Sequence, residues 1–238
     1  LNIVGVPLGR ELRQKELGMD KNMGKRGAVK SSVPFIMISS EGDLTLFKDR
    51  GSGILPTNCD DEYKCRYYEV SGSPHTDVDC PILSADSEIE KAGRIPQPMN
   101  DKIRETLNFF PLACYINGFL EKLYIWSTNG EAPDIIEPIE RDSDGKLVRD
   151  KFGNAVGGFR SPYLDIPAGT YDGYSPVDGI SGTFSKFSSE QMKDLYGSKA
   201  EYMKLFKDSL LMQIKDGFLY SGDAKRMYED MDSRINDF

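Results

Sequence analysis

The chain has 238 residues, of which 39% are hydrophobic and 11% are aromatic. That content is sufficient to bury one hydrophobic core, which excludes a largely disordered chain. Its 38 acidic and 30 basic residues give a formal net charge of −8, and the basic residues do not gather into a basic face. A nucleic-acid partner requires such a face, so we expect no binding to nucleic acid. No apolar run approaches the ~20 residues that cross a bilayer, so we also expect no membrane span.

Two short apolar segments predict neighbouring strands of a sheet. The first, "VPFIMISSEGD" at residues 33–43, opens with an apolar run from Pro34 to Ile38 and ends in small and acidic residues. A loop follows from Leu44 to about Tyr63, and then "RYYEV" at residues 66–70 precedes the turn formers "SGSP". Such continuous apolar runs are typical of strands buried on both faces of a mostly parallel sheet. Ligand-binding and catalytic groups of these sheets lie beyond the carboxyl ends of the strands.

The strongest helical pattern follows a second long loop at residues 77–100. Pro111 suits the first turn of this helix, and Gly130 is expected to end it. Five apolar residues recur at helical spacing and predict a stripe that packs on the core: Leu112, Ile116, Phe119, Leu123 and Trp126.

The last hundred residues predict hairpins and then helices. The Asp-Gly pair at 144–145 and the Gly-Asn pair at 153–154 indicate turns and short strands between residues 140 and 167. Ser188 and Ser198 each stand three residues before a glutamine or glutamate, which predicts capped helices. Ser221 is expected to cap a last helix at about residues 222–235.

The one histidine of the chain, His75, follows the second predicted strand in "YYEVSGSPHTD". Imidazole is the side chain whose unperturbed pKa lies nearest neutrality, so His75 is a candidate general base, although a lone histidine is often structural. Glu41 and Asp43 follow the first strand, and on an extended chain they would point to the same side. An acid after one strand and a histidine after the next is the order found in the second half of an α/β-hydrolase triad.

The nucleophile of such a triad is not evident, because the motif G-x-S-x-G does not occur in the chain. The opening "LNIVGVPLGREL" lacks an initiator methionine and is typical of mid-domain sequence, so we expect the nucleophile elbow to lie upstream of residue 1. A competing hypothesis for "HTDVD" is a metal site built from His75, Asp77 and Asp79. A facial triad requires a second histidine, so we do not expect a metal site here. Hydrolysis by a Ser-His-acid triad needs no metal or organic cofactor, and we expect none.

Longer motifs resemble the bacterial "alpha/beta hydrolase domain" family of serine esterases, in its C-terminal portion. The similarity covers most of the chain from about Val33. It includes "RYYEVSGSPHTD", "YIWSTNGEAP", "GKLVRDKFGNAVGGFRSPYLDIPAGTY", "GTFSKFSSEQMKDLYGSKAEYMKLF" and "GFLYSGDAKRM". The most distinctive string, D-x-x-G-N-x-x-G-G-x-R-[ST]-P, runs from Asp150 to Pro162. The resemblance implies that His75 is the catalytic base and that the acid lies in "SSEGD", as Asp43 or alternatively as Glu41.

These observations predict an α/β fold: the last strands of an α/β-hydrolase sheet with packed helices, and a small hairpin and helical C-terminal extension. Residues 1–130 would form the core part, and residues 131–238 the extension packed on the same domain. The expected function is carboxylic ester hydrolysis by a Ser-His-Asp/Glu triad; the alternative is a non-catalytic hydrolase-like binding or structural module.

The expected partners are a small-molecule ester and the N-terminal half of the same hydrolase, in the same or another chain. Two glycines shortly before Arg160 permit a close approach of the backbone. Arg160 could contact the substrate at the mouth of the site, or it could form an ion pair with a surface acid. Cys59 and Cys65 fall in one loop and can close a small ring, whereas Cys80 and Cys114 would have to meet in space. The sequence leaves the redox state and the compartment open.

Overall fold

The two apolar segments form strands that pair in parallel, as predicted. The computed structural model describes residues 30–47, 59–77, 86–96 and 101–236. Strand β1 spans Phe35–Ser40 and strand β2 spans Cys65–Val70, paired residue by residue along their lengths. On the other edge of β2, Val70 forms a parallel bridge with Phe159. The carboxyl ends of β1 and β2 therefore lie side by side, which brings the segments that follow them together.

The acidic segment after β1 is a short helix, α2 (Glu41–Leu46), rather than the predicted turn and loop. The hydroxyl oxygen of Ser40 accepts a hydrogen bond from the Asp43 N–H at 3.1 Å, and Asp43 Oδ2 accepts one from the Ser40 N–H at 3.1 Å. This reciprocal pair is a capping box, which satisfies two backbone donors at the start of a helix. The loop prediction was wrong for residues 44–46, because the Ser-x-x-Asp spacing at residues 40–43 starts a helix there.

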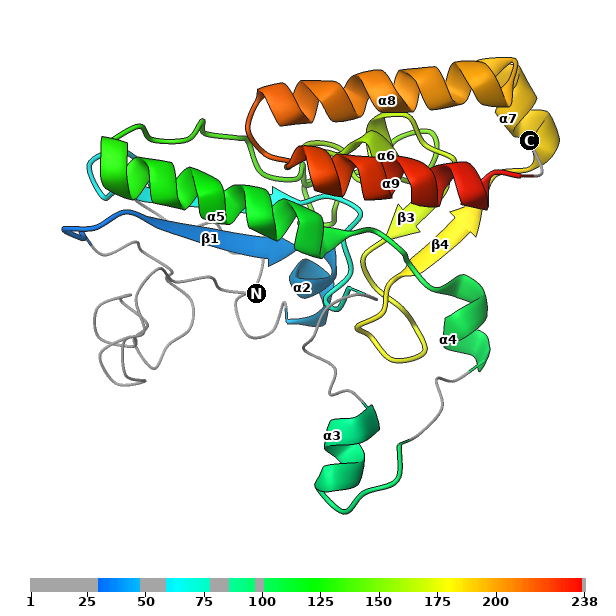
Figure 1. Ribbon diagram of the computed structural model, residues 1–238, viewed down its shortest axis with the longest axis horizontal. Coiled ribbons are helices and arrows are strands. Elements are labelled where there is room, and N and C mark those ends of the chain that lie inside the picture. Colours follow the sequence, from blue (N-terminus) through cyan, green and yellow to red (C-terminus); the bar gives the residue numbers. More distant parts are fainter. Residues whose placement is uncertain (1–29, 48–58, 78–85, 97–100, 237–238) are drawn as a thin grey trace.

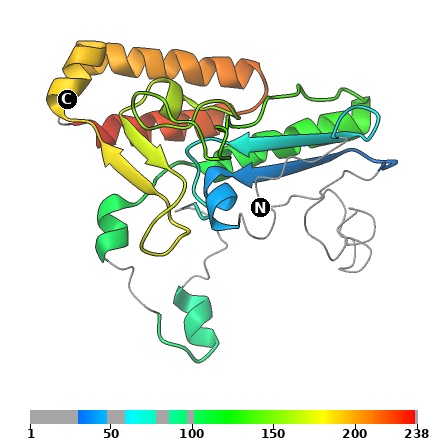
Figure 2. The same cartoon turned by 180° about the vertical axis from the view of Figure 1, so that it is seen from behind.

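Helix α5 (Leu112–Asn129) confirms the apolar stripe. It runs along β1 and β2 in both views of the molecule (Figures 1 and 2). The ring of Phe119 stacks on Tyr68 of β2 with centroids 4.9 Å apart. Pro111 is the N-cap residue rather than part of the first turn, and Gly130 ends the helix with a left-handed φ of 79°. Glycine adopts this conformation without steric strain, which explains its place at the helix end.

Two further short helices occupy the region around the second predicted loop. Helix α3 spans Asp86–Lys91 and helix α4 spans Asp101–Thr106. Neither helix buries a residue, so their sequences lack the apolar periodicity from which a helix is predicted. The prediction of a loop at residues 77–100 was therefore wrong for α3.

Residues 139–157 fold back on themselves through antiparallel bridges, and we call this segment the hairpin segment. The bridges join residues 139 to 157, 141 to 147 and 149 to 155. Gly145 and Gly153 have φ values of 75° and 82° at the two turns, so the turn predictions are confirmed. Helix α6 (Pro162–Asp165) follows, and then strands β3 (Gly169–Asp172) and β4 (Thr183–Lys186) form an antiparallel pair that was not predicted.

Three helices complete the chain: α7 (Ser189–Tyr196), α8 (Lys199–Lys215) and α9 (Ser221–Arg234). The hydroxyls of Ser188 and Ser198 accept hydrogen bonds from the third residue of α7 and α8, which confirms both caps. The predicted cap at Ser221 was wrong, since Tyr220 is the N-cap residue and α9 begins one residue earlier than expected.

One large cluster of buried apolar side chains joins the strands, α5 and the C-terminal helices. Its members come from both sides of residue 130 and include Ile38, Phe119, Phe159, Phe206 and Met227. The described parts of the two predicted regions therefore share a core. Among the residues placed in the structure, no helix is long and apolar enough to cross a bilayer.

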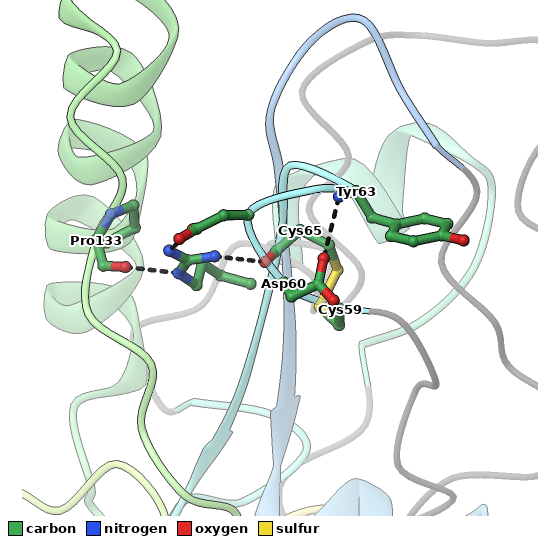
Figure 3. Close-up of a disulfide and its surroundings, with 7 residues drawn as sticks. Cys59, Asp60, Tyr63, Cys65 and Pro133 are labelled. Atoms are coloured by element: carbon green, nitrogen blue, oxygen red, sulfur yellow. Dashed lines mark hydrogen bonds and ion pairs between the residues drawn. A yellow bond between two sulfur atoms is a disulfide. The ribbon is translucent and has the colours of Figure 1, made fainter.

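A disulfide joins Cys59 and Cys65 at the start of β2 (Figure 3). The ring that it closes is held internally, because Asp60 accepts a hydrogen bond from the Tyr63 N–H at 3.1 Å through its side chain. Cys114 is buried in α5, whereas Cys80 lies outside the described residues, so that possible pair stays a prediction.

Candidate functional site

His75 and Asp43 meet at the carboxyl ends of the two parallel strands. The Nδ1 atom of His75 lies 2.5 Å from Oδ1 of Asp43. Asp43 is positioned by α2, and His75 by the loop that follows β2. The Asp43 side chain is 7% exposed, whereas that of His75 is 26% exposed, so the acid is enclosed and the imidazole is partly open. The ring of Phe47 meets the imidazole edge-on with centroids 5.1 Å apart.

The tautomer of His75 follows from this contact. An ionised carboxylate only accepts hydrogen bonds, so Nδ1 must carry the proton that points to Asp43. The other ring nitrogen, Nε2, makes no hydrogen bond to any part of the chain that the structure describes. Its lone pair is therefore available to accept a proton from another group.

The electrostatics favour an ionised Asp43. Burial acts to raise the pKa of this carboxyl, and the hydrogen bond from His75 is the largest of several interactions that act to lower it. The net result is a pKa below the ordinary aspartate value. Asp43 can therefore hold the imidazole in one tautomer and stabilise the imidazolium.

Close backbone contacts hold the two strand-end segments together. The Gly42 N–H donates to the carbonyl oxygen of Ser73 at 3.0 Å, and the Glu41 N–H donates to the Ser73 hydroxyl at 3.3 Å. A Cβ atom on Gly42 would lie 2.8 Å from the backbone nitrogen of His75 and closer still to the carbonyl oxygen of Gly173. Only glycine permits this approach, so Gly42 sets how near α2 comes to the histidine loop.

Glu41, the other candidate acid, forms no hydrogen bond or ion pair with His75. Its Oε2 accepts a hydrogen bond from the Gly72 N–H at 2.7 Å, and its Oε1 lies 2.5 Å from the Arg149 guanidinium and 3.2 Å from the Gly173 N–H. The side chain is 1% exposed. Burial raises the pKa of this carboxyl, and the charge of Arg149 and the Gly72 N–H oppose the rise.

Arg160 lies among protein groups that use all of its guanidinium nitrogens. Its Nε forms an ion pair with Asp165 at 2.6 Å, one terminal nitrogen donates to the Leu164 carbonyl at 2.8 Å, and the other donates to the Ala155 carbonyl. These contacts include the ion pair that was the alternative for Arg160, and its role in substrate binding stays a prediction.

Two residues of the metal hypothesis for "HTDVD" make other contacts in the structure. Asp77 Oδ2 accepts a hydrogen bond from the Ala113 N–H at 2.8 Å, at the start of α5, and His75 is turned toward Asp43. Asp79 lies outside the described residues. Within the described residues, no three His, Cys, Asp or Glu side chains gather closely enough to hold a metal ion.

Sequence reasoning missed three residues that support the site. Ser40 caps α2, and its signal was the Ser-x-x-Asp spacing. Asn108 is fully buried, and its amide donates to the carbonyl oxygens of Gly72 and Asp172. Arg149 reaches Glu41 from the hairpin segment, 108 positions away, and no local pattern predicts that pairing.

A family model described as "Alpha/beta hydrolase domain" matches residues 1–229. This match confirms the family resemblance, whereas the bacterial origin and the C-terminal position within the family stay predictions. No curated protein and no solved structure matches the chain.

Proposed function

Because the chain belongs to the alpha/beta hydrolase domain family, we propose that it supplies the acid and the base of a Ser-His-Asp triad that hydrolyses carboxylic esters. His75 is the general base and Asp43 is the acid that orients it. The nucleophilic serine comes from sequence outside these 238 residues, because they contain no G-x-S-x-G motif.

The observation that carries the proposal is the contact of His75 Nδ1 with Asp43 Oδ1, 2.5 Å apart at the ends of neighbouring parallel strands. A triad requires a base held in one tautomer by a buried carboxylate, with its second nitrogen open to the nucleophile. The enclosed Asp43 and the partly exposed side chain of His75 support this assignment. The order acid and then histidine along the chain is also the order of this fold class.

Acylation would begin when the serine hydroxyl attacks the ester carbonyl carbon. His75 Nε2 accepts the hydroxyl proton while Nδ1–H stays bonded to Asp43, whose negative charge stabilises the imidazolium. The tetrahedral intermediate then collapses, the bond between the carbonyl carbon and the alkoxy oxygen breaks, and Nε2 returns the proton to the departing alcohol.

Deacylation would use the same base on water. His75 Nε2 takes a proton from a water molecule as its oxygen attacks the acyl carbon. The second tetrahedral intermediate expels the serine oxygen, which recovers its proton from Nε2, and the carboxylic acid leaves. No step requires a group beyond the triad, the donors that stabilise the oxyanion, and water.

The second candidate function is a hydrolase-like module that binds without catalysis, and the missing nucleophile motif favours it. A fluorophosphonate probe distinguishes the two, because it forms a covalent adduct with an activated serine. The full-length natural polypeptide is treated with the probe and analysed by mass spectrometry. An adduct whose formation is lost in His75→Ala supports the triad, and the absence of any adduct supports the binding module.

The 238-residue chain alone gives a second test. We expect it to leave a p-nitrophenyl ester intact, since it holds the base and the acid but no nucleophile elbow. Ester hydrolysis by the chain alone that disappears in His75→Ala would show that the serine lies within these residues, and would overturn its assignment to outside sequence.

A further inference from the structure

We propose that Glu41 and Arg149 form a positioning pair that holds Asp43 and His75 in their productive geometry. This inference rests on the proposed function and deepens it. Glu41 forms no hydrogen bond or ion pair with His75, so we assign it as a positioning residue and not as the acid of the triad.

The carboxylate of Glu41 joins four segments at the ends of β1 and β2. It belongs to α2, the helix that carries Asp43. Its Oε2 holds the Gly72 N–H at 2.7 Å, three residues before His75. Its Oε1 holds the Arg149 guanidinium of the hairpin segment at 2.5 Å, and the Gly173 N–H after β3 at 3.2 Å. A movement of this carboxylate would therefore change the distance between the acid helix and the histidine loop.

The charge of Arg149 makes this arrangement possible. A buried carboxylate without a partner strongly destabilises the folded state, because it loses its hydration. An opposite charge within hydrogen-bonding distance offsets that desolvation cost. Arg149 also approaches Asp172 Oδ2 at 3.7 Å. Arg149 pairs with the carboxylate of Glu41, whereas the carboxylate of Asp43 contacts the imidazole of His75.

The chain contains a matched comparison in Glu69 and Arg141. Glu69 is also 1% exposed, and its Oε1 lies 2.6 Å from the Arg141 guanidinium. Its other oxygen accepts from the Ile139 N–H at 2.9 Å, and the Tyr67 hydroxyl donates to Oε1 at 2.8 Å. In the described part of the chain, no hydrogen bond or ion pair joins the Glu69 side chain to residues 71–77. Glu69 therefore holds the start of the hairpin segment through Ile139 and Arg141, and it has no polar contact with the histidine loop.

The presence of one histidine allows a direct measurement on the intact chain. With ¹⁵N-labelled histidine, the nitrogen signals of His75 report its tautomer by NMR without overlap from other rings. A ring held as Nδ1–H gives two well-separated nitrogen signals above its titration, and exchange between tautomers makes the signals converge. We compare wild type with Glu41→Gln, Arg149→Lys, Glu69→Gln and Asp43→Asn, and check the fold of each by circular dichroism.

We expect separated signals in wild type and in Glu69→Gln, and converging signals in Glu41→Gln and in Asp43→Asn. Arg149→Lys keeps the charge but loses the planar fork, so a partial convergence is expected. If Glu41→Gln fails to fold, the His75 signals of Arg149→Lys still test the positioning role. If Glu41→Gln and Arg149→Lys leave the signals as separated as Glu69→Gln does, the positioning role is overturned while the triad stands. Converging signals in wild type itself would instead contradict the contact on which the proposed function depends.

Discussion

The Nδ1 atom of His75 lies 2.5 Å from Oδ1 of Asp43, although the two residues are 32 positions apart in the chain. The parallel pairing of β1 with β2 ends both strands at the same edge, and each residue follows its strand within a few positions. The capping box with Ser40 occupies Oδ2 of the same carboxylate, so each oxygen of Asp43 has its own partner. The side chain of Asp43 thus takes part both in the cap of α2 and in the candidate triad.

Asp43→Asn tests the role of this carboxylate in catalysis. The amide cannot favour the Nδ1–H tautomer or stabilise the imidazolium, so we expect kcat for ester hydrolysis by the full-length natural polypeptide to fall on the order of 10³- to 10⁴-fold, with a small change in KM. Steady-state kinetics measure both. Asp142→Asn changes an exposed carboxylate of the hairpin segment and serves as the control. Loss of less than about tenfold in Asp43→Asn would remove Asp43 from the triad.

Gly42→Ala tests the close approach of α2 to the histidine loop. The added methyl group would overlap backbone atoms of Gly173 and His75, and backbone atoms do not yield as a flexible side chain does. Overpacking of this kind costs about 1–3 kcal/mol of unfolding free energy, which urea denaturation measures.

The matched control for that substitution is Gly222→Ala. Gly222 lies in α9, and apart from its chain neighbours and the nearby backbone of its own helix a methyl group there would meet no atom within 4 Å. Alanine favours the helix over glycine, so this variant should be unchanged or more stable by about 0.5–1 kcal/mol. Equal losses of unfolding free energy in the two variants would contradict the claim that the close approach at Gly42 requires glycine.

The sequence predicted the parts of the fold that have strong local patterns. Continuous apolar runs revealed β1 and β2, and the stripe from Leu112 to Trp126 revealed α5. The same strands placed His75 and an acid at one edge, which is a consequence of parallel pairing. Short polar elements such as α3 and β4 were missed because they bury little and leave no periodic pattern.

The choice between Glu41 and Asp43 could not be made from the sequence. On an extended chain the two side chains would share a side, but residues 41–46 are helical, and residues two apart on a helix point in different directions. Asp43 consequently faces His75, and Glu41 faces Arg149. The second pairing joins residues 108 positions apart and depends on the tertiary fold alone.

The lowered pKa of Asp43 predicts how stability changes in acid. A carboxyl whose pKa is lower in the folded than in the unfolded state contributes stability above its unfolded pKa, about 3.9. That contribution is lost as the pH falls through the lower folded value. We therefore expect the stability difference between wild type and Asp43→Asn to shrink as the pH falls below about 4. Urea unfolding at several pH values measures it; a difference independent of pH down to about 3 would contradict the shift.

The disulfide at the start of β2 should stabilise the fold without acting on the site. Cys59 and Cys65 are six positions apart, and closing so short a loop stabilises a fold by about 2 kcal/mol in the chain-entropy model. They lie at the opposite end of β2 from His75. Urea unfolding of Cys59→Ser/Cys65→Ser should show this loss, with the ¹⁵N signals of His75 unchanged. Thiol alkylation with and without reductant, followed by mass spectrometry, verifies the bond in wild type. Altered His75 signals in a folded double variant would show that the two ends of β2 are coupled.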